Sequence, residues 1–183
     1  LEELTISHDF AIPGNPKSNS RAERSNRHVL EGGRSLLMHA GLPIPFWIFA
    51  IEYFCWTCNI RPWKGHISAW QHRFGEPCMA PKLPFGCAID YHPSEVDPRK
   101  ASRPKYRSKG IPGIFLGYVH KAGGQVSDHV RVVAVDEMSD ISFSTGGKKI
   151  NDGEKPYVDT VHIKDCYWDL EKKLEFLWKI KGF

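Results

Sequence analysis

Small and apolar residues recur every three or four positions through the first part of the chain. The series consists of Ala22, Val29, Gly33, Leu36, Leu37 and Ala40. This spacing predicts a helix that begins near Ser20 and ends before Gly41. A second helix is predicted over about residues 46–60, which are apolar nearly all round apart from Glu52. Because this segment is too short to cross a bilayer, we expect a buried core helix packed on the first.

The second half of the chain changes to the shorter period that is typical of β-strands. Short segments rich in β-branched and aromatic residues alternate there with turns that contain Gly or Pro. The predicted strands span residues 85–91, 114–119, 130–135, 141–143 and 158–163. Such a series is typical of a small antiparallel barrel or sandwich. A short strand is also predicted over residues 5–12, and helical spacing of leucines predicts a helix over 167–180.

The change of period predicts an α+β fold class with two main parts. The expected divisions are a helical part (1–65), a connector rich in Trp, Gly and Pro (66–83), a β module (84–165), and a terminal amphipathic helix or tail (166–183). With 41% hydrophobic and 25% charged residues, the 183-residue composition is that of a globular chain and not of a disordered one. The net charge of +4 permits a nucleic-acid partner without requiring one.

The five cysteines are odd in number and irregularly spaced, so they do not predict a disulfide framework. With no secretory signal in the sequence, we expect an intracellular, reducing compartment and no membrane partner. Cys55 and Cys58 form a CxxC motif inside the second predicted helix, whereas a redox pair usually opens a helix after a strand. We therefore expect buried core cysteines, and a thiol oxidoreductase is only a distant alternative function.

Glu23 is the first residue with two competing interpretations. Ser20 and Glu23 match the capping-box pattern, in which the serine side chain caps a helix and the glutamate reaches back. On a helical wheel, Arg27 and Arg34 lie close to Glu23, and Leu30 interrupts this polar side. Charges in such a pattern usually form a solvated face. Taken alone, these residues do not indicate an enzyme.

A series of short motifs in a fixed order changes this interpretation. They run through Asn15-Pro16, Asn19, Ala22-Glu23-Arg24, Asn26-Arg27, Arg34-Ser35, Ala40-Gly41-Leu42-Pro43, Phe46-Trp47, Phe74-Gly75, Phe85-Gly86-Cys87 and Gly113-Ile114-Phe115-Leu116-Gly117-Tyr118. Together they cover roughly residues 13–140. In this order and spacing, the chain resembles the integrase of copia-type LTR retrotransposons, which is part of a retrovirus-related Pol polyprotein.

The resemblance implies the end of an RNase H-like catalytic core followed by an SH3-like β-barrel. Such cores use two aspartates and a glutamate to hold Mg²⁺ or Mn²⁺ for phosphodiester transfer, because hard ions prefer oxygen ligands. By position, Glu23 resembles the third carboxylate, a catalytic residue and metal ligand. Both aspartates precede the glutamate in that family, and only Asp9 precedes Glu23 here. We therefore expect this chain alone to be inactive and to bind no ion tightly. Ser20 and Arg21 also depart from the family, which has a glycine and a small apolar residue there.

The same resemblance implies contacts with DNA. Asn19 lies in the loop that approaches DNA in such enzymes, and Arg27 and Arg34 are placed to reach phosphate. A second cationic segment, ahead of the predicted strand 114–119, contains Arg99, Lys100, Arg103, Lys105, Arg107 and Lys109. It is either a solvated loop that keeps a β surface soluble or a loop that follows the phosphate backbone, since cation clusters supply sequence-independent affinity. Nothing in the sequence predicts base-specific contacts.

The expected partners are therefore element ends and target DNA, an upstream integrase segment, and a second copy of the chain in a homo-oligomer. A nuclear location at the integration step is also implied. The leading function is DNA integration in a parent protein, with nucleic-acid binding in this piece. The alternative is a non-catalytic DNA-binding or scaffold remnant of a decayed retroelement.

Overall fold

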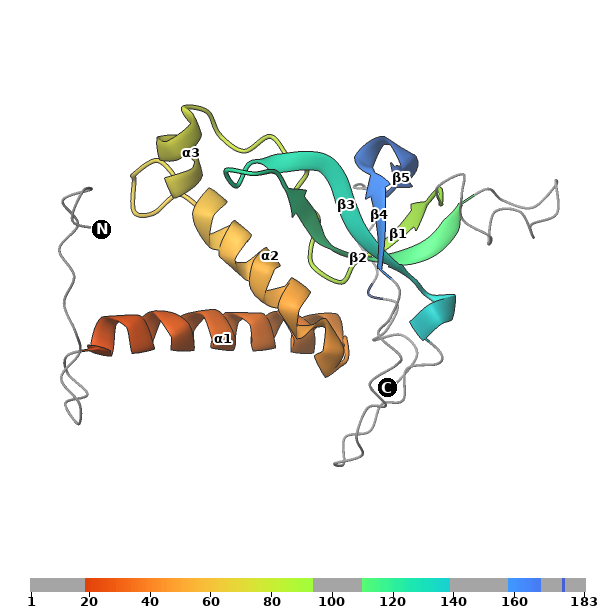
Figure 1. The fold of residues 1–183 in the computed structure, drawn as a ribbon, viewed down its shortest axis with the longest axis horizontal. Coiled ribbons are helices and arrows are strands. Elements are labelled where there is room, and N and C mark those ends of the chain that lie inside the picture. Colours follow the sequence, from red (N-terminus) through yellow and green to blue (C-terminus); the bar gives the residue numbers. More distant parts are fainter. Residues whose placement is uncertain (1–18, 94–109, 139–157, 169–175, 177–183) are drawn as a thin grey trace.

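The computed structural model describes residues 19–93, 110–138, 158–168 and 176 (Figure 1). The helices are α1 (Ser20–Ala40), α2 (Trp47–Ile60) and α3 (Ala69–Phe74), with 3-10 turns η3 (Ile44–Phe46), η4 (Asp136–Met138) and η5 (Ile163–Asp165). The strands are β1 (Ala88–Tyr91), β2 (Ile111–His120), β3 (Val126–Ala134), β4 (Val158–His162) and β5 (Cys166–Tyr167). The predicted strand segments 5–12 and 141–143 lie outside the described residues.

The two long helices form where the apolar spacing predicts them. Helix α1 ends at Gly41, whose left-handed φ of 71° lets its N–H reach the carbonyls of Leu37 and Met38. Two glycines then allow α2 to pack closely, because a Cβ on Gly32 would overlap the Phe54 ring and one on Gly33 would meet Ile51. The predicted packing of the first helix on the second is confirmed.

The details of this packing differ from the prediction. Leu37 is buried and Val29 and Leu36 are half-buried, but Ala22 is exposed because α1 extends past the start of the contact. Helix α2 is not buried all round, since Trp47 and Ile48 face solvent. The expectation of two buried cysteines in this helix is wrong. Cys58 is exposed and Cys55 is half-buried, whereas the buried thiols are those of Cys87, just before β1, and Cys166 of β5.

The five described strands form one antiparallel, curled sheet in the order β4-β3-β2-β1-β5 (Figure 1). The register between β2 and β3 shifts at Gly117, whose φ of 134° few other residues adopt. Curling brings β1 and β4 together although they are not neighbours. The Tyr91 hydroxyl on β1 donates a 2.5 Å hydrogen bond to the buried Asp159 carboxylate on β4.

Four of the predicted strands are confirmed, with ends that shift by a few residues. Strand β5 and helix α3 were not predicted. Tyr167 belongs to β5, so a helix does not begin there, and most of the remaining segment 168–180 lies outside the described residues. Helix α3 falls inside the predicted connector, and the buried Ser68 caps it by accepting a 3.1 Å hydrogen bond from the Gln71 N–H.

The helical and β parts share a single apolar core. The Trp56 ring of α2 lies 4.7 Å from the Tyr118 ring of β2, and Tyr53 lies 6.1 Å from Phe115, measured between ring centres. Buried residues of α1, α2 and the sheet form one continuous cluster. The sheet is therefore packed on α2, while the limits of the predicted domains stay a prediction.

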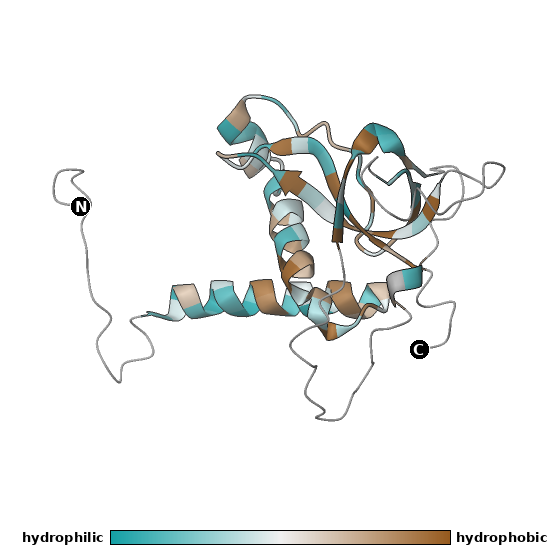
Figure 2. Ribbon diagram, turned by 45° about the vertical axis from the view of Figure 1, so that its right-hand side comes forward, coloured by the Kyte–Doolittle hydropathy of each residue, from teal (hydrophilic) through white to brown (hydrophobic). Residues whose placement is uncertain are grey.

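The first half of α1 projects away from the rest of the molecule. Residues 20–28 are all exposed, and Figures 1 and 2 show this mostly hydrophilic end of the helix extending beyond the sheet and α2. His28, at the end of this segment, contacts α2, and the centre of its ring lies 5.2 Å from that of Phe54. The side chains of α1 before His28 are exposed to solvent.

Candidate nucleic-acid interface

The start of α1 is built without the predicted capping box. The N-cap residue is Asn19, with φ of −119°, and its side chain makes no capping hydrogen bond. Ser20 is already helical, so it does not occupy the cap position that the capping-box interpretation requires. That interpretation is therefore wrong. Glu23 lies in the first turn with its side chain exposed, and helix capping does not account for it.

The structure brings Glu23 together with two of the predicted phosphate contacts. At 3.6 residues per turn, Glu23, Arg27 and Arg34 point within about 40° of one another around the α1 axis. All three are exposed. Leu30 lies on the same strip and is 55% exposed, which shows that the apolar interruption belongs to the surface and not to the core. Arg21 and Arg24 add two more exposed cations to this end of the helix.

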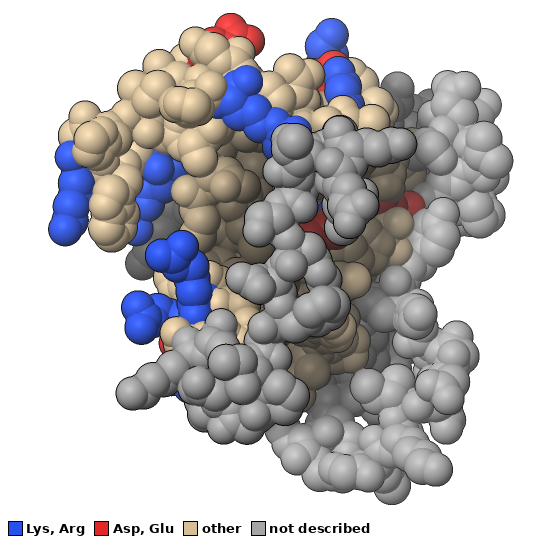
Figure 3. Space-filling model, turned by 60° about the vertical axis from the view of Figure 1, so that its left-hand side comes forward, with Lys and Arg blue, Asp and Glu red and all other residues tan. Residues whose placement is uncertain are grey.

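The charges on this end of α1 favour an anionic partner. Glu23 precedes Arg27 by one turn, an arrangement that weakly stabilises a helix. Four arginines stand against two glutamates along the exposed length of α1. Figure 3, which brings this end of the molecule forward, shows several Lys and Arg side chains and few acidic ones among the coloured residues. The second predicted cationic segment, 99–109, lies outside the described residues, so its six cations stay predictions.

The carboxylate of Glu23 does not belong to a metal site within the described residues. No group of three or more His, Cys, Asp or Glu side chains that fits a metal ion is found in that part of the chain. Glu23 offers the hard oxygen donor that Mg²⁺ prefers, but a two-metal centre needs several converging carboxylates. Any such site would need acidic residues other than those described.

None of the described helices is long and apolar enough to cross a membrane.

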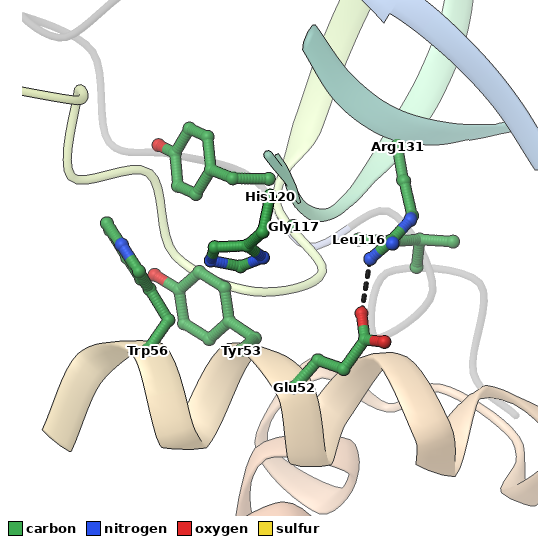
Figure 4. A pocket seen from close by; sticks show the side chains of 8 residues that line it. Glu52, Tyr53, Trp56, Leu116, Gly117, His120 and Arg131 are labelled. Carbon is green, nitrogen blue, oxygen red and sulfur yellow. Dashed lines mark hydrogen bonds and ion pairs between the residues drawn. The ribbon is translucent and has the colours of Figure 1, made fainter. Parts of the chain in front are cut away.

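The pairing of Glu52 with Arg131 was missed by the sequence analysis. Glu52 is the polar interruption of α2, and its carboxylate accepts a hydrogen bond and ion pair from the Arg131 guanidinium of β3 (Figure 4). Together with His120 they line a shallow hollow over the aromatic contacts between α2 and the sheet. Because the two residues are 79 positions apart, no local pattern identifies the pair.

Burial controls the ionisation of the groups around this hollow. The Tyr53 hydroxyl donates a 2.5 Å hydrogen bond to the Leu83 carbonyl, and burial raises the pKa of both Tyr53 and Tyr118. Burial also lowers the pKa of His120, while Glu52 opposes this shift and Arg131 adds to it. Burial therefore favours the neutral form of Tyr53, Tyr118 and His120.

The ordered motifs resemble those of retrotransposon Pol polyproteins, and sequence comparison supports this resemblance. The chain is 34% identical over 118 residues to the retrovirus-related Pol polyprotein from transposon TNT 1-94 of Nicotiana tabacum, a match that covers 62% of the chain. It is also 34% identical over 121 residues to the corresponding polyprotein from transposon RE2 of Arabidopsis thaliana, covering 64% of the chain.

The matched segment spans about 8% of the length of each of these relatives. A third similar protein, from transposon RE1 of Arabidopsis thaliana, matches 62% of the chain at 34% identity. No family model matches the chain, and no solved structure matches it significantly. The predicted resemblance to a retrotransposon Pol polyprotein is confirmed.

About half of the described motif residues that carry the resemblance are buried. Ala40 closes α1 and lies against Gly86, where an added Cβ would overlap its side chain. Phe46, Phe115 and Leu116 are almost completely buried. Packing at the junction between the helices and the sheet therefore accounts for these motif positions. Packing does not explain the exposed motif residues at the start of α1, which indicates a different role for them.

Proposed function

We propose that this chain is a segment of a retrotransposon integrase, in which it binds nucleic acid and supplies one acidic residue of the catalytic centre. The single observation that supports the proposal best is the exposed strip of Glu23, Arg27 and Arg34. These motif residues are free of core packing, and the cap geometry does not use Glu23. In this proposal α1 and α2 are the helical end of an RNase H-like core, and the curled sheet is an SH3-like module.

The proposed roles follow from the chemistry of each side chain. The Glu23 carboxylate would be one of the oxygen ligands for Mg²⁺ or Mn²⁺ in the complete parent, where the ions activate and hold the oxygens of the phosphodiester. Arg27 and Arg34 would bind phosphate on the same side of the helix, with Asn19 close to the DNA strand. The cations of segment 99–109 would add sequence-independent affinity. Activity at the DNA ends, assembly with an upstream segment or a second copy, and a nuclear location belong to the same proposal.

Duplex binding tests the nucleic-acid part of the proposal. The chain should bind a duplex of mixed sequence, and affinity should fall as salt rises, because phosphate contacts release counterions. Changing Arg27 and Arg34 together to Gln should lower the affinity and reduce the slope of log Kd against log salt by about 2, since each phosphate contact contributes roughly 0.9. Fluorescence anisotropy at several salt concentrations measures both quantities.

A matched variant separates specific contacts from net charge. Lys82 and Lys164 are also exposed, and changing both to Gln removes the same charge far along the chain from α1. The Lys82 and Lys164 double variant should reduce the slope of log Kd against log salt much less than the Arg27 and Arg34 double variant does. Equal effects of the two double variants would show that net charge alone drives binding and would contradict the proposed contact strip. No detectable duplex binding would favour a scaffold remnant over a DNA-binding segment.

A further inference from the structure

Trp63 is held on the surface by a tight turn that the sequence analysis did not identify. The His66 N–H donates a 2.8 Å hydrogen bond to the Trp63 carbonyl, and these two residues also form an isolated β-bridge. The turn residues Lys64 and Gly65 have φ of 41° and 82°, as a type I′ turn requires at both central positions. The Trp63 side chain is 65% exposed. A large aromatic ring is thus presented to solvent on a short, hydrogen-bonded turn.

Cations lie on this turn and on three elements at the same end of the molecule. The Lys64 ammonium lies 5.4 Å from the centre of the Trp63 ring, and Arg61 is the residue at the end of α2. Arg73 projects from α3 toward the β2–β3 hairpin, where a guanidinium nitrogen lies 3.9 Å from the Cβ position of Gly124. Lys121 is in the same hairpin turn, since its carbonyl accepts the Gly124 N–H at 2.9 Å. We name Arg61, Trp63, Lys64, Arg73 and Lys121 the Trp63 surface.

The arrangement of the elements brings these residues to one end of the molecule. In both Figure 1 and Figure 2, the tip of the β2–β3 hairpin lies beside α3 and the loop that precedes it. Arg61, Lys64, Arg73 and Lys121 are exposed, and the acidic residues of these elements are Glu52 on α2, Glu76 after α3 and Asp128 on β3. Glu52 forms an ion pair with Arg131 of β3. Apart from that pair, four cations stand against two acids, which makes this end of the molecule attractive to a polyanion.

We propose that the Trp63 surface binds single-stranded nucleic acid, with an unpaired base stacked on the Trp63 ring and neighbouring phosphates on the cations. A stacking partner needs a free π-face, which a base inside a duplex does not offer. Cations placed around an aromatic platform are the combination that single-strand binders use, because the ring accepts any base and the charges follow the backbone. This inference rests on the proposed function, since it assigns a further nucleic-acid contact to the same chain.

Comparing single-stranded and duplex DNA tests the inference. The complete chain should bind a labelled oligothymidine, and Trp63→Ala should lower that affinity by between about 5-fold and about 150-fold, the range expected for loss of one stacked base. Trp63→Phe should restore part of the affinity because it keeps an aromatic face. Duplex affinity should change much less in both variants. Trp47→Ala is the matched control, because Trp47 is 52% exposed at the other end of α2.

The outcomes distinguish failure of this inference from failure of the proposed function. Salt-dependent duplex binding together with single-strand binding that Trp63→Ala leaves unchanged would overturn the Trp63 surface and leave the proposed function standing. Absence of binding to either DNA would overturn both. Equal losses for Trp63→Ala and Trp47→Ala would show a general destabilisation, which circular dichroism of the variants would detect.

Discussion

His120 illustrates how a single residue reports on the contact between α2 and the sheet. Burial lowers its pKa, so the folded protein favours the neutral imidazole. The unfolded chain binds the proton near the ordinary pKa of about 6.5. The unfolded state therefore binds more protons between that value and the lowered one. Stability that is complete above about pH 6.5 is then lost as the pH falls through this window.

The prediction is that His120→Gln makes the stability of the chain less sensitive to acid. Its free energy of unfolding, measured in urea at several pH values between 5 and 8, should decline less below pH 6.5 than that of the parent. The exposed His72 of α3 provides the control, and His72→Gln should keep the slope of the parent. Identical pH slopes for the parent and His120→Gln would show that His120 is not held neutral by the fold.

Other residue-level features explain where sequence reasoning succeeded and failed. Exposure of Glu23, Arg27 and Arg34 could be predicted, because helical spacing places them on one side, away from the most apolar face. The prediction of a helix cap at Ser20 was wrong because a four-residue pattern does not fix where the first helical turn begins. Trp63 was missed because its exposure depends on a positive φ at Lys64, which the sequence does not signal.

At the scale of elements, the junction between α1 and the start of the sheet depends on Gly86. Its φ is 80°, and an added Cβ would overlap the Ala40 side chain at the end of α1. Changing Gly86 to Ala combines left-handed backbone strain of about 1–2 kcal/mol with overpacking of about 1–3 kcal/mol. We predict a loss of about 2–5 kcal/mol in the free energy of unfolding, measured by urea denaturation.

Gly75 offers a matched control for this prediction. Its φ of 82° is nearly the same, but a Cβ there would meet nothing within 4 Å. Gly75→Ala should therefore lose only the free energy of unfolding that comes from left-handed backbone strain, without the part that comes from steric overlap. If the two variants lose the same stability, the contact between Ala40 and Gly86 does not hold the helix end against the sheet.

The predicted elements were found where a long periodic pattern specifies them. Helix α1 and strands β2 and β3 extend over nine or more residues each, so their patterns are well defined. Helix α3 has six residues and β5 has two, which is too short for a periodicity to emerge. Pairings such as Tyr91 with Asp159 join residues 68 positions apart, so only the curl of the sheet reveals them.

For the whole molecule, one core joins the helical part to the sheet, and two cationic regions lie outside it. The start of α1 carries Glu23 with its arginines, and the Trp63 surface lies at the far end of α2. Helix α2 connects these regions, because α1 packs on it and the Trp63 surface begins at its end.

The role of Glu23 is tested most directly by strand joining in a longer protein that adds an upstream segment with two aspartates to this chain. Glu23→Gln removes a charged oxygen ligand while keeping the shape of the side chain, so DNA binding should change little. Joining of a labelled element end to target DNA, in the presence of Mg²⁺ or Mn²⁺, should fall to background. Glu31→Gln, on the same exposed helix, should keep the activity of the parent. Full joining activity with Gln at position 23 would contradict the catalytic role of Glu23.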